Sequence, residues 1–137
     1  MSRQRVPARL RRLVRERAGE RCEYCLLAET DAFFAHEPDH IIAEKHRGKS
    51  TADNLALACF DCNRFKGSDI ASIDPATGKL VALFNPRTQL WNEHFKIKEG
   101  KIIPLTATGR ATAALLKFNL AARVEVREIL FKSGRYP

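Results

Sequence analysis

The sequence predicts a small α+β domain in which a structural metal holds short strands and helices around one core. Three observations support this fold class: a length of 137 residues, two Cys-x-x-Cys pairs, and helix and strand patterns that alternate along the chain. A chain of this length can bury one modest core but not two independent ones. We therefore expect a single domain over residues 1–137, with a core motif at 22–67 and a C-terminal extension at 74–132.

The first expected element is a basic helix over residues 7–18. Pro7 suits its first turn and Gly19 suits its end. Its apolar positions share one face: Leu10, Leu13, Val14 and Ala18. Its other face carries arginines, which are usually only solvated but also offer contacts to backbone phosphate: Arg9, Arg11, Arg12, Arg15 and Arg17.

The middle of the chain predicts short elements joined by turns. A strand is expected over 32–42, interrupted by Pro38, followed by a turn at 48–50 and a polar loop at 51–54. A short helix begins near Cys59 and ends at Gly67, because glycine is a favoured residue after a helix. A turn over 74–78 leads into a strand over 80–84.

The C-terminal extension is expected to enlarge the core with a hairpin and one long helix. Thr108 is a plausible cap for a helix over 110–132. The apolar positions of this helix line one face and predict core packing: Ala111, Leu115, Phe118, Ala122, Val126 and Ile129.

The chain is strongly basic, with 24 Lys and Arg against 16 Asp and Glu, and a formal net charge of +8. A small basic domain favours a polyanionic partner, nucleic acid before membrane, although a solvated basic surface without a partner is the alternative. No apolar run reaches the length of a membrane span, and the N-terminus lacks the apolar stretch of a signal peptide. We therefore expect a cytoplasmic protein without a membrane partner.

All four cysteines belong to the two pairs, Cys22/Cys25 and Cys59/Cys62. The spacing within each pair lets both thiolates bind one ion, as in structural four-cysteine Zn²⁺ sites. In a reducing compartment such pairs favour metal binding over two disulfides, which are the alternative. Residues 26–58 between the pairs hold the residues that are suited to chemistry.

Together with the residues between and directly after them, these cysteines form an ordered set that resembles the HNH endonuclease family, in its ββα-metal form with zinc-bound knuckles. The resemblance covers residues 22–67, and its third motif position, often His in the family, is Asn here. It rests on Asp39-His40-Ile41-Ile42, Gly48, Asn54-Leu55-Ala56-Leu57 and Cys59-x-x-Cys62-Asn63-x-x-Lys66-Gly67. It implies a metal-dependent endonuclease that acts on DNA and leaves 5′-phosphate and 3′-hydroxyl ends.

The residue types give this chemistry a physical basis. Histidine is the side chain best suited to accept a proton near neutral pH, so His40 is the candidate general base on water. Asp39 projects to the opposite side of the strand, and with Asn63 it offers an oxygen-only ligand pair that favours Mg²⁺ or Mn²⁺. The resemblance gives Asn54 the role of orienting His40. Structural alternatives are a helix cap for Asn63, a turn for Asn54 and a buried structural role for His40.

Two basic residues after the second cysteine pair are candidate nucleic-acid contacts, Arg64 and Lys66. Lys66 follows Asn63 by three positions and so shares its helical face, where it either binds phosphate or is solvated. His36, Arg87 and His94 receive no role. We expect double-stranded DNA as substrate. One such site cuts one strand at a time, so a double-strand break would need two copies, and the sequence leaves both a monomer and a homodimer as alternatives. The rival functions are a zinc-stabilised nucleic-acid-binding module without cleavage and a disulfide-bonded protein.

Overall fold

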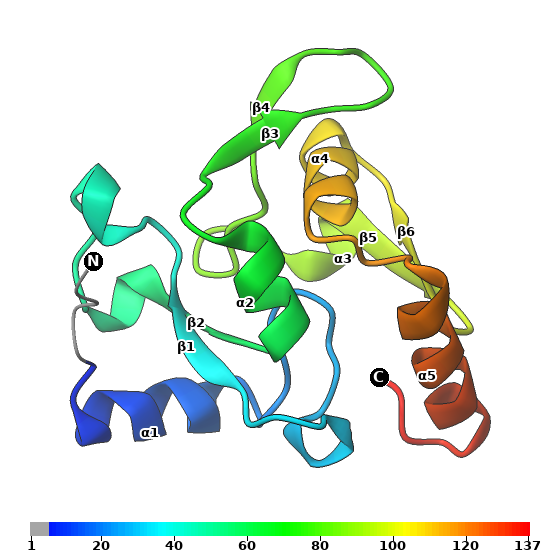
Figure 1. The fold of residues 1–137 in the computed structure, drawn as a ribbon, viewed down its shortest axis with the longest axis horizontal. Coiled ribbons are helices and arrows are strands. Elements are labelled where there is room, and N and C mark those ends of the chain that lie inside the picture. Colours follow the sequence, from blue (N-terminus) through cyan, green and yellow to red (C-terminus); the bar gives the residue numbers. More distant parts are fainter. Residues whose placement is uncertain (1–5) are drawn as a thin grey trace.

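The computed structural model describes residues 6–137, and Figure 1 shows the arrangement of its elements. The β1–β2 hairpin and α1 lie at one end, the β5–β6 hairpin with α4 and α5 lies at the other, and the β3–β4 hairpin projects between them. The helices are α1 Ala8–Arg17, α2 Phe60–Lys66, α3 Trp91–His94, α4 Ala107–Leu115 and α5 Ala121–Lys132. The strands are β1 Glu37–His40, β2 Leu55–Ala58, β3 Ala71–Ile73, β4 Leu80–Ala82, β5 Phe95–Lys98 and β6 Lys101–Pro104.

The helix α1 agrees with the sequence prediction and rests on the β1–β2 hairpin. Its residue Val14 is fully buried and belongs to a small cluster with Val6, Leu55 and Leu57, whereas Leu13 stays 43% exposed. Three of its arginines bind other parts of the chain: Arg11 binds Glu37, Arg15 binds Glu29, and Arg17 donates to the carbonyl of Leu55.

The strand β1 is shorter than the predicted strand over 32–42, because it begins only at Glu37. The preceding Phe33 and Phe34 lie outside it and are exposed. Pro38 is accommodated because the sheet has only two strands, so each has an unpaired edge where a missing N–H costs nothing. Antiparallel pairing places Asp39 opposite Ala56 and His40 opposite Leu55.

The helix α2 follows β2 directly, as the sequence predicted. Its N-cap is Cys59, whose sulfur accepts from the N–H of Cys62, and it ends at Gly67, which has a positive φ of 53°. The strand β2 is buried along its whole length between α1 and the rest of the core. The four cysteines therefore lie at the junction of β2, α2 and the loop after α1.

The turn over 74–78 is present and joins β3 to β4 in an antiparallel hairpin. The sequence predicted only the second of these strands. Asp74 organises this hairpin: its carboxylate accepts from the N–H of Ala76 at 2.9 Å and from the hydroxyl of Thr77 at 3.0 Å. The same carboxylate binds Arg110 of α4 through two contacts of 2.8 and 2.9 Å. The hairpin is thus attached to α4.

The predicted helix over 110–132 is wrong in its extent, because two helices, α4 and α5, replace it. The cap is Thr106 rather than Thr108, and its hydroxyl accepts from the N–H of Gly109 at 3.0 Å. The chain turns between the helices, where Lys117 has a positive φ of 52°. Asn119 stabilises this turn because its amide binds both the N–H and the carbonyl of Ile102, at 3.0 and 2.8 Å.

This break also corrects the predicted core face. Ala111 and Phe118 are fully buried, but on α5 the side chains of Val126 and Ile129 are 46% and 62% exposed. The buried residue of α5 is instead Arg127, which donates to the carbonyls of Gly100 and Phe118.

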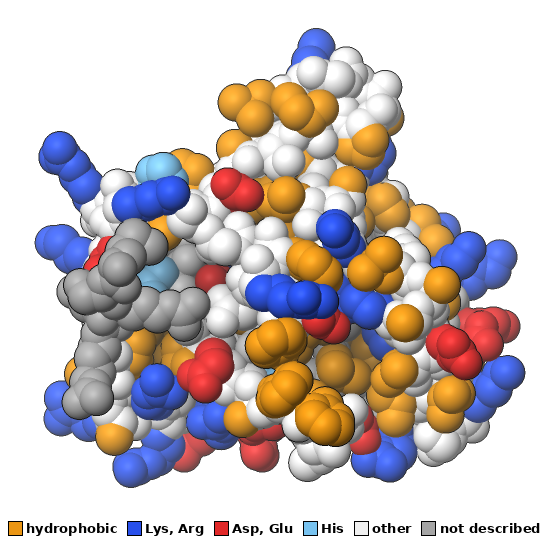
Figure 2. Space-filling model, viewed as in Figure 1, with side chains coloured by type: hydrophobic (Ala, Val, Ile, Leu, Met, Phe, Trp, Pro, Cys, Tyr) orange, Lys and Arg blue, Asp and Glu red, His pale blue; other side chains and the backbone are white. Residues whose placement is uncertain are grey.

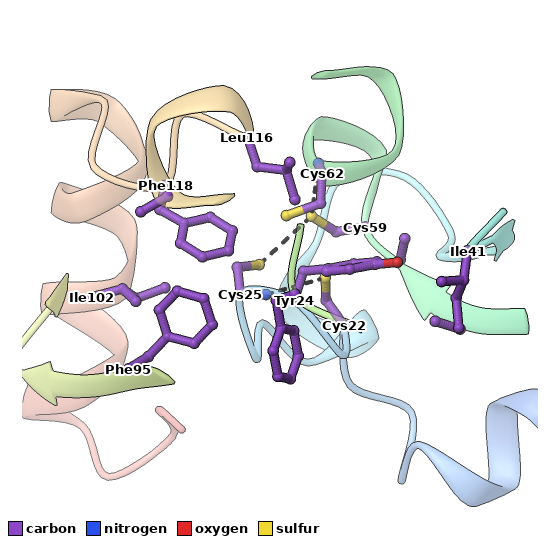
Figure 3. Close-up of a cluster of buried hydrophobic side chains, with 14 residues drawn as sticks. Cys22, Tyr24, Cys25, Ile41, Cys59, Cys62, Phe95, Ile102, Leu116 and Phe118 are labelled. Atoms are coloured by element: carbon purple, nitrogen blue, oxygen red, sulfur yellow. Dashed lines mark hydrogen bonds between the residues drawn. The ribbon is translucent and has the colours of Figure 1, made fainter. Parts of the chain in front are cut away.

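The main hydrophobic core joins the cysteines to the C-terminal extension, as Figure 3 shows for its central part. Phe95 contacts Phe118 with ring centroids 5.6 Å apart, and Ile102 and Leu116 are fully buried beside them. The side chain of Trp91 donates to the carbonyl of Tyr24 at 2.8 Å, and that of Tyr136 donates to the carbonyl of Cys25 at 2.7 Å. Across residues 6–137, no helix has both the length and the apolar character needed to cross a membrane.

Candidate zinc centre and active site

The four cysteine sulfurs form one buried cluster in which every pair lies within 4.8 Å. All four cysteines are free, and the sulfurs of Cys25 and Cys59 are 3.6 Å apart. That separation is too long for a disulfide of about 2.05 Å. It is close to the distance of about 3.8 Å expected between two thiolates on a tetrahedral Zn²⁺ with Zn–S bonds of about 2.3 Å. The cluster therefore fits a zinc ion and excludes the disulfide alternative.

Each cysteine pair forms a knuckle with an internal N–H to sulfur contact. The N–H of Cys25 lies 3.4 Å from the sulfur of Cys22, and the N–H of Cys62 lies 3.4 Å from that of Cys59. Burial raises the pKa of the Cys22 and Cys62 thiols, whereas a hydrogen bond with Cys22 lowers that of Cys25. Zinc must therefore displace protons from the buried thiols when it binds.

A basic residue of α5, Arg123, completes this centre, and sequence reasoning missed it. Its guanidinium donates to the sulfur of Cys62 at 3.2 Å and lies 3.8 Å from that of Cys59. Burial opposes its charge, but the thiolates of Cys62 and Cys25 raise its pKa above the ordinary value. Because four thiolates exceed the charge of one Zn²⁺ by two, a cation beside the sulfurs stabilises the loaded site.

His40 ends β1, where its half-buried ring can reach both protein and solvent. Its Nε2 lies 2.8 Å from the hydroxyl oxygen of Ser50. Sequence reasoning did not identify Ser50, which is ten positions away in a loop without a regular pattern. This contact fixes one side of the imidazole.

Asn54 closes the loop that carries Ser50. Its Oδ1 accepts from the N–H of Ile42 at 2.9 Å, and its Nδ2 donates to the carbonyls of Ile42 and Lys49 at 3.0 and 2.9 Å. Gly48 is required at the closest point, because a Cβ there would lie 1.6 Å from the oxygen of Ile42. Within the described residues, these contacts connect Asn54 to His40 through the loop rather than directly.

Asp39 is only 5% exposed, and two groups bind its Oδ2. The hydroxyl of Tyr24 donates to it at 2.9 Å, and the ammonium of Lys66 lies 3.1 Å away. Burial raises the pKa of Asp39, while Lys66 and Tyr24 act in the opposite direction. Tyr24 lies between Cys22 and Cys25 in the sequence, and Figure 3 shows its ring extending from the cysteines toward Ile41. The first knuckle is thus joined directly to the candidate carboxylate.

The structure corrects the prediction that Lys66 contacts nucleic acid. The side chain is 2% exposed, and its ammonium also donates to the carbonyls of His40 and Ile41 at 3.1 and 3.2 Å. Since it binds three groups of β1 and the residue after it, Lys66 attaches α2 to the end of this strand. No surface remains on it for a phosphate.

Asn63 lies one turn before Lys66 on α2 and is half-buried. Residues three apart share a helical face, so Asn63 faces the same end of β1 as Lys66. The cap alternative is excluded, since Cys59 is the N-cap and the N–H of Asn63 donates to its carbonyl at 2.9 Å. By this helical spacing Asn63 lies on the side of α2 that carries Lys66, the residue that binds Asp39 and the carbonyl of His40.

The remaining polar candidates are arranged differently. Arg64 is exposed, binds Asp61 at 3.2 Å and lies over the ring of Phe65, with its guanidinium carbon 4.4 Å from the centroid. Three residues without a predicted role make contacts within the protein: His36 with the carbonyl of Leu27, Arg87 with Glu23, and His94 with Thr106.

In the sequence, Asp39 and His40 lie between the two cysteine pairs of the buried centre, and Asn63 follows the last cysteine directly. Residues 22–69 match the HNH endonuclease family. The match covers about a third of the chain and includes both knuckles and α2. Searches of curated proteins and of solved structures found no match. The HNH match supports a nuclease-type function and implies a nucleic-acid substrate.

Proposed function

We propose that the chain is a metal-dependent HNH endonuclease that hydrolyses phosphodiester bonds of double-stranded DNA. The observation that carries this proposal is the attachment of α2, the helix that carries Asn63, through Lys66 to the end of β1 that bears Asp39 and His40. The family match of residues 22–69 supports the same conclusion. The reducing environment of the cytoplasm would keep the four thiols available for zinc.

His40 serves as the general base in this proposal. When its Nε2–H donates to Ser50, its Nδ1 carries the lone pair that accepts a proton from water. The loop closed by Asn54 keeps Ser50 in place, which orients the imidazole before substrate arrives. A fixed tautomer matters because the wrong one would present an N–H to the water instead of a lone pair.

Asp39 and Asn63 would hold one Mg²⁺ or Mn²⁺, and the donor set fits such an ion because both side chains offer hard oxygen atoms. Tyr24 and Lys66 both bind Oδ2 of Asp39, which makes Oδ1 the oxygen for the cation. The bound ion would supply charge stabilisation at the phosphoryl group. Because Lys66 already offsets the charge of Asp39, we expect weak cation binding until a phosphate adds negative charge.

Exposed basic residues on the loop after His40 would attract the DNA backbone. Lys45, Arg47 and Lys49 lie on the loop between His40 and Asn54, and all three are exposed. Such charges supply sequence-independent affinity that falls with rising salt. A single site of this kind cuts one strand, so a double-strand break would require two copies or two events.

The experiment is a nicking assay on supercoiled plasmid with the zinc-loaded protein, with Mg²⁺ or Mn²⁺ and without either. We expect nicked circles only with the divalent ion, and loss of nicking in His40→Ala at unchanged zinc content. The rival is a nucleic-acid-binding zinc module without cleavage, which the net charge of +8 would serve equally well. Plasmid binding without nicking under every metal and pH condition would favour that rival.

A further inference from the structure

Three exposed phenylalanines form a continuous aromatic row across the surface between the loop before β1 and α2. Phe33, Phe34 and Phe60 are 95%, 52% and 49% exposed. The ring centroids of Phe33 and Phe34 are 5.0 Å apart, and those of Phe34 and Phe60 are 4.8 Å apart. Figure 2 shows hydrophobic side chains gathered on the lower part of this face, with Lys and Arg side chains directly above them.

A cleft of about 610 Å³ lies beside the aromatic row, and α5 forms its other wall through Ala122 and Val126. Its volume is ample for a planar group the size of a nucleobase. Two acidic residues also line it, and both are paired within the protein: Asp31 with Arg135, and Asp61 with Arg64 and Arg123. The cleft therefore has no uncompensated carboxylate to repel a polyanion.

Two cations and the further ring of Phe65 follow the aromatic row at its α2 end, and Arg64 lies over both Phe60 and Phe65. The guanidinium carbon of Arg64 lies 5.4 Å from the centroid of Phe60, and the ammonium of Lys117 lies 4.8 Å from that of Phe65. Alternating rings and cations are suited to a strand that exposes bases on one side and phosphates on the other. A purely apolar partner surface would offer these two cations no acceptor, whereas the phosphates of a nucleic-acid strand would.

The aromatic row also continues into the candidate active site. Phe60 precedes Asn63 by three positions on α2, so their side chains are neighbours with Cβ atoms about 5–6 Å apart. That is close to the spacing of adjacent nucleotides in an extended strand. A base on Phe60 would therefore belong to a nucleotide next to the phosphate at Asn63.

We propose that the aromatic row stacks unpaired bases, so that the substrate of this nuclease carries a single-stranded segment beside the phosphate that is cut. The second half of this statement rests on the proposed endonuclease function, whereas the stacking itself does not. Bases inside a duplex are covered by their neighbours and cannot meet these rings. Frayed ends, flaps and single strands expose the faces that the row requires.

The test measures binding by fluorescence anisotropy in the zinc-loaded His40→Ala protein, without Mg²⁺ or Mn²⁺. The probes are a labelled oligothymidine of about 12 nucleotides, an abasic strand of equal length and a matching duplex. Base stacking predicts that oligothymidine binds about fivefold or more tighter than the abasic strand. Phe34→Leu and Phe60→Leu, which keep an apolar side chain without a ring, should reduce this ratio. Phe131→Leu, which removes an exposed ring outside the cleft, should preserve it.

Equal affinity for the thymidine and abasic strands would overturn the proposal, since phosphate contacts alone would then explain binding. So would a change from dimer to monomer in Phe34→Leu, measured by sedimentation, at unchanged affinity for oligothymidine. A protein that cleaves neither plasmid nor a duplex with a single-stranded flap, yet prefers oligothymidine through Phe34 and Phe60, would confirm the stacking row and refute only the endonuclease proposal.

Discussion

The buried ion pair between Lys66 and Asp39 gives the sharpest test of how this site is built. The perturbation is Lys66→Met, which keeps the length of the side chain but removes its charge. In the structure the ammonium is 2% exposed and contacts Asp39 at 3.1 Å together with the carbonyls of His40 and Ile41. The variant would leave a buried carboxylate without its cation.

The expected magnitude follows from this burial. Removing one partner of a buried ion pair costs about 3–5 kcal/mol of folding free energy, because the other charge stays desolvated. That is a large part of the ~5–15 kcal/mol typical of a whole domain. Asp39→Asn should also destabilise the protein, while the double variant should lose less than the sum of the two single variants.

The assay is urea unfolding of the zinc-loaded proteins at several pH values. Burial raises the pKa of Asp39 above its unfolded value, and without Lys66 this pKa rises further. When folding raises the pKa of a carboxyl group, the free energy of unfolding falls as pH rises from the unfolded pKa, about 3.9, to the folded pKa. The deficit of Lys66→Met should therefore shrink as pH falls from neutral through the folded pKa, because protonation removes the buried charge.

The control is Lys132→Met, since the side chain of Lys132 is 71% exposed and lies 3.9 Å from Glu128 on the same helix. It should change the folding free energy by no more than about 0.5 kcal/mol. A Lys66→Met deficit as small as that of the control, with no pH dependence, would refute the reasoning. It would mean that water reaches the pair in solution.

Three further predictions concern other parts of the chain. Arg123→Met removes the cation beside the sulfurs, so zinc affinity should fall by about 10-fold or more in a competition with a chromophoric chelator; an unchanged affinity would contradict a role for Arg123. Gly48→Ala places a Cβ 1.6 Å from the oxygen of Ile42, so it should lower the thermal midpoint and reduce plasmid nicking; an unchanged midpoint would contradict this close approach. The hydrogen bond with Arg110 lowers the pKa of Asp74. The Asp74–Arg110 pair therefore stabilises the fold above the unfolded pKa, and this stabilisation is lost as pH falls below about 4. In urea unfolding, Arg110→Met should show a smaller loss of stability on acidification than the unmodified protein.

Several elements followed from local patterns in the sequence. The helix α1 and the helix after Cys59 formed where capping and periodicity placed them. The cysteine cluster was predictable because the spacing within each pair brings two ligands together through one tight turn. The HNH resemblance also rests on short spacings, so the family match over residues 22–69 agrees with it.

The sequence predictions were wrong where the backbone conformation depends on a contact with a residue far away in the sequence. The helix over 110–132 was predicted as continuous because its apolar residues keep one period, but Asn119 binds Ile102 and the chain breaks there. Phe33 and Phe34 looked like strand residues because of their β propensity, yet β1 begins after them. Propensity describes the local backbone, and the tertiary contact overrides it.

The residue types and spacings by themselves determined the four-cysteine cluster and led to the prediction of His40 as general base, because metal ligation and proton transfer depend on chemical groups that the sequence states directly. Only the tertiary structure decided the surroundings of those groups: the burial of Lys66 against Asp39, the contact of Ser50 with His40, and the position of Arg123 beside the sulfurs. Each of these contacts joins separate elements, and the physical reason is that burial and charge pairing are properties of the packed chain rather than of its local segments.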